Sequence, residues 1–276
     1  MTADVDTLYQ QHLTETDRRL LRSVTGIESP SLALGHPAVE AAVFRPADDD
    51  DRSLVGTSPF LTFATAVHRT AARLETASFV EERWTPRQRV AVFDVRSLRD
   101  LLAEPVRRLF LVELLASYTH VHSGVTWERT PRGWRRRRFS ELDPVRLAGL
   151  LEVVDARERP GVLRRLGDLA LFLTGVFPDH PSAATIGGAA AGRLLRLTGV
   201  PGRQGEDRAG QALLEQLGAR WYGLAAASAK AQGTPMTSAL AVMEEMAARF
   251  HDARRVLNVV TDRYLFPVRD RWFGVA

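Results

Sequence analysis

The sequence contains no cysteine and almost no lysine. Without cysteine, disulfide bonds and cysteine-ligated zinc sites are excluded. Lys230 is the single lysine, so arginine supplies 36 of the 37 basic residues. Such a bias, with abundant alanine, leucine, valine and glycine, is typical of a GC-rich bacterial genome. The net charge of +4 and the pI of about 10.0 are therefore weak signals of a nucleic-acid partner, and the positions of the arginines matter more.

Long apolar runs are also missing. The first 17 residues are polar and acidic and lack the apolar region of a signal peptide. The longest apolar stretch, residues 166–178, is interrupted by Asp168 and falls short of the roughly 20 residues that cross a bilayer. We therefore expect a cytoplasmic protein with no membrane partner.

What remains is ordinary globular composition, with 45% hydrophobic and 25% charged residues in a chain of 276. Apolar residues recur mostly at helical spacing, which predicts a mainly α fold, a helical bundle-like domain over residues 56–276. Residues 1–55 are expected to form an arm, with one helix to residue 24 and then a long loop containing Pro30 and Pro37. Two short strands are predicted within residues 79–95, and a helix over residues 97–122 that Pro105 must kink or split.

A second β element is predicted at residues 124–139. Thr130-Pro131-Arg132-Gly133 is a turn signal, because proline presets φ and glycine accepts a positive φ. Trp127 precedes the turn and Trp134 follows it. The segment contains six arginines: Arg129, Arg132, Arg135, Arg136, Arg137 and Arg138.

This arginine-rich hairpin is the strongest functional signal in the sequence. Guanidinium groups suit phosphate oxygens, and aromatic rings stack on bases. The leading hypothesis is thus a non-enzymatic regulatory or accessory protein that binds DNA or RNA through the hairpin. Two other readings stay open. The hairpin can bind an acidic protein surface, or it can be a solvated scaffold whose arginines pair with acidic neighbours and whose tryptophans pack on the core.

The stretch from Leu166 to His180, LGDLALFLTGVFPDH, resembles a motif of a group of uncharacterised bacterial, mostly helical proteins. The helical segment AARFHDARRVLNVV from Ala247 resembles their C-terminal helices, so the resemblance spans about residues 140–265. It implies a helical fold and no known activity. Within the motif, Gly167 and Gly175 permit close helix packing, and the carboxylate of Asp168 needs a partner, for which Arg164 and Arg165 are candidates.

No catalytic or metal-binding pattern is complete. His120 and His122 share a face only on an extended backbone, and no carboxylate is near them in the sequence. Asp179 and His180 lack a recognisable nucleophile. We predict no catalytic residue, no metal ligand and no cofactor, and rank an enzyme or metal protein last. A helical protein-interaction module or homo-oligomeric scaffold is the main alternative to nucleic-acid binding.

Overall fold

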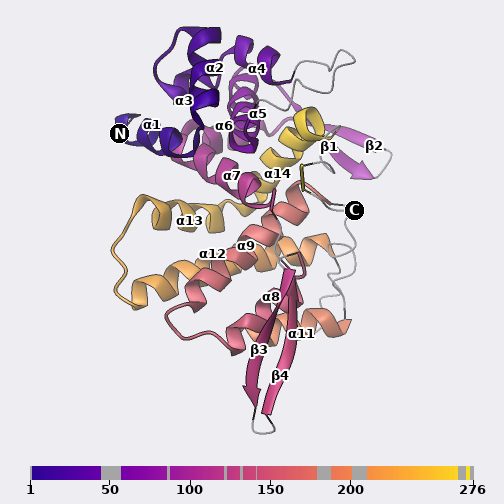
Figure 1. The fold of residues 1–276 in the computed structure, drawn as a ribbon. Coiled ribbons are helices and arrows are strands. Elements are labelled where there is room, and N and C mark those ends of the chain that lie inside the picture. The colour runs from indigo at the N-terminus through magenta and orange to yellow at the C-terminus, as the bar shows by residue number, and fades with distance from the viewer. Residues whose placement is uncertain are drawn as a thin grey trace. The chain divides into compact units, whose positions relative to one another are not determined.

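A computed structural model describes residues 2–44, 57–85, 88–120, 123–130, 133–140, 142–178, 188–200, 210–266 and 272–273. Backbone contacts divide the chain into two compact units, unit 1 (Met1–Thr119 with Arg255–Ala276) and unit 2 (His120–Arg254). The described residues are mainly helical, with two small antiparallel hairpins (Figure 1). The predicted mainly α fold with a small β element is confirmed. The division predicted near residue 55 falls on residues outside those described.

Unit 1 is built from helices and one hairpin. Its elements are α1 (Thr2–His12), α2 (Glu15–Thr25), α3 (Pro30–Ala33), α4 (Pro37–Val43), α5 (Pro59–Leu74), β1 (Val80–Thr85), β2 (Gln88–Val92), α6 (Val95–Ala103), α7 (Pro105–Ser117) and η2 (Thr261–Leu265). The hairpin β1–β2 confirms the strands predicted within residues 79–95. The helix α14 (Phe250–Val260) begins in unit 2 and ends in unit 1.

Prolines that predicted loops in the sequence start helices in unit 1. Pro30 and Pro37 occupy the first turns of α3 and α4, so the long loop predicted after residue 24 is wrong over residues 30–33 and 37–43. Proline suits that position because its missing N–H would be unpaired there in any case. Pro105 likewise begins α7, so it splits the predicted helix rather than kinking it.

The helix predicted to residue 24 is also wrong, because it is broken at Thr14. The Thr14 hydroxyl accepts a hydrogen bond from the Asp17 amide at 3.1 Å, and the Asp17 carboxylate accepts one from the Thr14 amide at 2.9 Å. This capping box starts α2. The other oxygen of Asp17 accepts a hydrogen bond from the amide of Ser58, the residue that caps α5, at 3.0 Å.

A histidine and a tyrosine form a polar contact inside unit 1. Tyr9 is fully buried and His68 is 4% exposed, and 2.8 Å separates the Tyr9 hydroxyl from His68 Nε2. Burial, together with the positive charge of Arg108, lowers the pKa of His68 to about 3. Burial raises the pKa of Tyr9. Both side chains are therefore neutral at physiological pH, and the contact joins α1 to α5.

Two ion-pair networks fix the C-terminal segment within unit 1. Glu40 binds Arg69 at 2.6 Å and Arg73 at 2.7 Å, and accepts a hydrogen bond from the Tyr264 hydroxyl at 3.1 Å. Burial raises the pKa of Glu40, but the hydrogen bonds from these two arginines lower it by more, so the pKa lies below its ordinary value.

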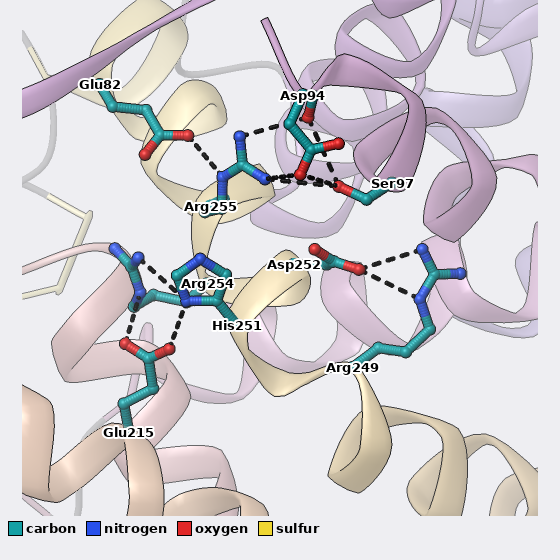
Figure 2. A network of polar contacts seen from close by, with 9 residues as sticks. All are labelled: Glu82, Asp94, Ser97, Glu215, Arg249, His251, Asp252, Arg254 and Arg255. Carbon is teal, nitrogen blue, oxygen red and sulfur yellow. Dashed lines mark hydrogen bonds and ion pairs between the residues drawn. The ribbon is translucent and has the colours of Figure 1, made fainter. Parts of the chain in front are cut away.

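The second network surrounds Arg255, which is 3% exposed. Its Nε donates a hydrogen bond to Glu82 on β1 at 2.5 Å (Figure 2). Its Nη1 donates one at 3.2 Å to Asp94, the residue just before α6. A buried guanidinium must be paired, and these contacts supply its partners. They tie the hairpin β1–β2 to α14 and to the start of α6.

Unit 2 consists of a hairpin and a group of packed helices. Its elements are β3 (Ser123–Thr130), β4 (Gly133–Ser140), α8 (Pro144–Ala148), η1 (Gly149–Glu152), α9 (Arg159–Gly175), α11 (Gly188–Thr198), α12 (Gln211–Ala231), α13 (Ser238–Ala248) and the first part of α14. The close pairing of α9 with α12 forms its centre.

Glycine allows that close approach. A Cβ atom placed on Gly167 would lie 2.6 Å from the ring of Tyr222, and one on Gly218 would lie 2.7 Å from the Cβ of Ala170. Both distances are far below van der Waals contact, so neither position accepts a larger residue without a shift. The expectation that Gly167 permits close packing is confirmed.

Candidate nucleic-acid interface

The hairpin β3–β4 follows from its turn sequence. Thr130 is paired with Gly133, so only residues 131–132 connect the two strands. Gly133 has φ of 112°, a value that favours glycine. The predicted hairpin at residues 124–139 is confirmed, one residue longer at each end. β4 packs against α8, and in Figure 1 the strand ends nearest the turn lie away from α9 and α12.

The strand register distributes the arginines over both faces of this hairpin. Paired positions in an antiparallel sheet share a face, and neighbouring positions along a strand alternate. One face, here called the tryptophan face, contains the strand positions Val125, Trp127, Arg129, Trp134, Arg136 and Arg138. The opposite face contains Gly124, Thr126, Glu128, Arg135, Arg137 and Phe139. Both tryptophans are therefore on the same face as three of the arginines.

Both tryptophan side chains are exposed. Trp127 is 60% exposed and Trp134 is 68% exposed. The alternative in which these rings pack on the core is wrong. Large apolar side chains in solvent mark binding surfaces when they occur together. An indole ring offers a flat face for stacking and an N–H for a polar contact.

The charge of the protein is concentrated in this segment. Residues 123–140 contain six arginines and one acidic residue, Glu128, which gives a net charge of +5. Since the whole chain has a net charge of +4, the remainder is net negative by one. Outside this segment the basic and acidic residues of the chain therefore nearly balance in total. This segment has the positive potential that attracts polyanions.

Acidic partners within the hairpin are few. By register, only Arg135 is opposite a carboxylate, that of Glu128, whereas Arg136 is opposite Trp127 and Arg137 is opposite Thr126. Arg132 lies outside the described residues. The side chains of Arg129 and of Arg135 to Arg138 lie outside them as well, so the interface is defined by backbone register and by the two tryptophans.

Asp168 contacts one partner that the sequence predicts and one that it does not. Its Oδ2 is 4.0 Å from Nε of Arg164, one of the two predicted partners. Its Oδ1 accepts a hydrogen bond from the Tyr222 hydroxyl at 2.7 Å, and Asp168 is only 8% exposed. The other predicted partner, Arg165, is half-buried. Tyr222 is 54 residues away on α12, so no local pattern could identify it. The group links α9 to α12.

A second polar cluster in unit 2 lies on α12 and the first part of α14. Glu215 contacts His251 Nδ1 at 2.6 Å and Arg254 Nε at 2.8 Å, and Arg249 pairs with Asp252 at 3.1 Å (Figure 2). Each carboxylate in it is engaged by an arginine. Glu215 thus links α12 to α14, whereas Arg249 and Asp252 pair locally at the start of α14, and no nucleophile lies beside the histidine among the residues drawn.

The remaining candidates give no assembled site. His120 is exposed, whereas His122, Asp179 and His180 lie outside the described residues. Among the described residues, no three histidine or acidic side chains are grouped so that they could hold a metal ion. Within the same residues, no helix is both long and apolar enough to cross a membrane.

Comparison with known proteins returned no match to a protein-family profile, to a curated protein or to a solved structure. Membership of the uncharacterised group that the motif at Leu166–His180 resembles therefore stays a prediction.

Proposed function

We propose that this protein is a non-enzymatic nucleic-acid-binding protein that holds single-stranded DNA or RNA on the tryptophan face of the hairpin β3–β4. The observation that carries the proposal is the pair of exposed tryptophans on one face with three arginine positions. Stacking recognises every base, and arginines recognise every phosphate, so this combination suits a single strand with little sequence preference.

The spacing of the tryptophans supports an unpaired base as the ligand. Trp127 is paired with Arg136, so Trp134 occupies the diagonal position across the strands. Diagonal neighbours in an antiparallel pair are about 7–8 Å apart. That is about twice the 3.4 Å rise between stacked bases. One base can therefore be held between the two indole rings. A base that is paired and stacked within a duplex cannot enter this space, because its faces are already covered by its neighbours.

The test measures fluorescence anisotropy of labelled single strands of about 16 nucleotides, a length that covers the usual site size. Oligo-dT and oligo-U are compared with a duplex of equal length. We expect micromolar binding of the single strands and weaker binding of the duplex. Tighter binding of the duplex, or no binding of any probe at low salt, would refute the proposal. In the second outcome an acidic protein becomes the partner to search for.

Variants locate the binding surface. Trp127→Ala and Trp134→Ala should each weaken binding by about 1–3 kcal/mol, or about 5- to 150-fold. If one base lies between both rings, the double variant should lose little more than either single variant, because the two rings act on the same base. Substitution by phenylalanine should retain most of the affinity. Phe93→Ala, at an equally exposed aromatic in unit 1, is the matched control and should bind normally.

The quadruple variant Arg135–Arg138→Gln tests the electrostatic part of the proposal. It removes four of the six positive charges of the hairpin, including two of the three arginine positions on the tryptophan face, and should weaken binding and lower its salt dependence. Its circular dichroism spectrum and unfolding transition should match those of the wild type. Affinity and salt dependence equal to those of the wild type in this folded variant would exclude the hairpin as the interface.

A further inference from the structure

Unit 1 contains a cavity far from the hairpin β3–β4 in the sequence. Its volume is about 340 Å³, and it lies among the end of α5, the hairpin β1–β2, the end of α14 and η2. That volume is at the small end of the range for pockets that bind small molecules, about 300–1,000 Å³. The cavity is mainly apolar, and its apolar lining comes from Leu74, Ala77, Phe79, Val80 and Val259.

Two of the three arginines that line the cavity already form ion pairs within the protein. Arg73 pairs with Glu40 at 2.7 Å and donates to the Tyr264 hydroxyl at 3.0 Å. Arg89 pairs with Asp262 at 3.2 Å. Both arginines therefore have partners within the protein, and neither requires a ligand.

One acidic and one basic side chain in the lining differ from the rest. Glu81 on β1 and Arg263 on η2 both line the cavity and are exposed. Among the described residues neither has an ion-pair partner within 4.0 Å, and the guanidinium of Arg263 only lies over the ring of Tyr264 at 5.9 Å. The cavity thus presents one uncompensated carboxylate and one uncompensated guanidinium beside apolar walls.

We infer that this cavity binds a small zwitterion with an apolar side chain, namely a free hydrophobic α-amino acid such as leucine or phenylalanine. Its ammonium group pairs with Glu81, its carboxylate with Arg263, and its side chain packs against Leu74, Phe79 and Val80. A guanidinium matches a carboxylate with two parallel hydrogen bonds, which makes such pairs specific.

The neutral sum of these two charges argues for a zwitterion rather than for a simple ion. A simple carboxylate would pair with Arg263 but would be repelled by Glu81. A simple amine would pair with Glu81 but would be repelled by Arg263. A ligand that offers both charges compensates both residues at once. The cavity is too small for a peptide of several residues, which favours the free amino acid.

The experiment titrates the full-length protein with leucine, phenylalanine and two truncated forms of leucine by isothermal calorimetry. The truncated forms are 4-methylpentanoate, which lacks the amine, and 3-methylbutylamine, which lacks the carboxylate. We expect leucine or phenylalanine to bind and each truncated form to bind about tenfold more weakly, since each loses one charge-assisted contact. No heat from either amino acid, or equal affinity for leucine and a truncated form, would overturn the inference.

Two conservative variants assign the contacts. Glu81→Gln should weaken the binding of leucine by about tenfold and leave the binding of 4-methylpentanoate no weaker. Arg263→Gln should likewise weaken the binding of leucine by about tenfold and leave the binding of 3-methylbutylamine no weaker. Both residues are exposed, so both variants should keep the wild-type unfolding transition. Leucine binding unchanged in both variants would exclude this cavity as the site. Because these residues belong to unit 1 and the hairpin to unit 2, the result is independent of nucleic-acid binding.

Discussion

Replacing Arg136 and Arg138 with glutamine tests whether nucleic acid lies on the tryptophan face of the hairpin. Three arginine positions share that face, Arg129, Arg136 and Arg138. Each phosphate neutralised on a single strand contributes about −0.7 to the slope of log K against log salt. Three contacts therefore give a slope of about −2. A rise from about 50 mM to about 200 mM salt should then weaken wild-type binding by about 20-fold.

The double variant Arg136→Gln/Arg138→Gln should retain one of these contacts. Its slope should be about −0.7, so the same rise in salt should weaken binding by only about threefold. The matched control is Arg135→Gln/Arg137→Gln, which removes the same charge from the opposite face of the same strand. Its slope should stay near −2. Because both variants lower the net charge by two, a difference between them reports position and not total charge.

The assay is fluorescence anisotropy of labelled oligo-dT over a series of salt concentrations, with the slope as the measured quantity. Equal slopes in the two double variants would refute the assignment to one face. A steeper loss of slope in the Arg135→Gln/Arg137→Gln variant would place the nucleic acid on the opposite face, away from both tryptophans.

Three further predictions concern stability, each measured by urea unfolding. Unfolded His68 takes up a proton below its ordinary pKa of 6.5, whereas the buried side chain does so only near pH 3, so the free energy of unfolding falls as the pH falls. Between pH 6.5 and 5 the wild type should lose up to about 1.4 kcal/mol per pH unit relative to His68→Gln. Parallel plots of unfolding free energy against pH for the two proteins would contradict this. Gly218→Ala should destabilise by about 1–3 kcal/mol, whereas Gly223→Ala on the same helix, where a Cβ meets no atom within 4 Å, should stabilise by up to about 1 kcal/mol; the same sign for both would contradict the packing argument. Tyr222→Phe should cost about 1–3 kcal/mol because it removes a hydrogen-bond donor from buried Asp168, and an unchanged midpoint would show that this bond contributes nothing.

Features set by neighbouring residues could be predicted from the sequence. The turn of β3–β4 ends at Gly133, which has a positive φ. The start of α8 depends on Pro144 and on Asp143, whose carboxylate accepts hydrogen bonds from the amides of Val145 and Arg146. These interactions act within a few residues, so the pattern of residue types contains them. The same holds for Pro105, because proline interrupts a helix through its own ring geometry, whatever the packing of the rest of the chain.

Other features depend on residues far apart in the chain. Proline is common both in loops and in first helical turns, so Pro30 and Pro37 favoured a loop until packing in unit 1 showed two helices. The hydroxyl that binds Asp168 comes from a helix 54 residues away. The exposure of Trp127 and Trp134 depends on where the hairpin lies relative to the helices of unit 2. Composition could not decide it, because tryptophan occurs both in cores and at interfaces.

The hairpin β3–β4 is a costly structure for the free protein. A two-stranded sheet is marginal by itself. By register a single arginine of this hairpin, Arg135, is opposite a carboxylate residue, Glu128, so its charge of +5 is mostly uncompensated across the strands. Two tryptophans on its surface add apolar area that water does not favour. Each of these costs falls when a polyanion with stacking faces occupies the tryptophan face, since phosphates neutralise the arginines and bases cover the indole rings. A purely structural hairpin would have no need to combine all three features, whereas a hairpin that binds single strands requires the charge and the exposed rings together.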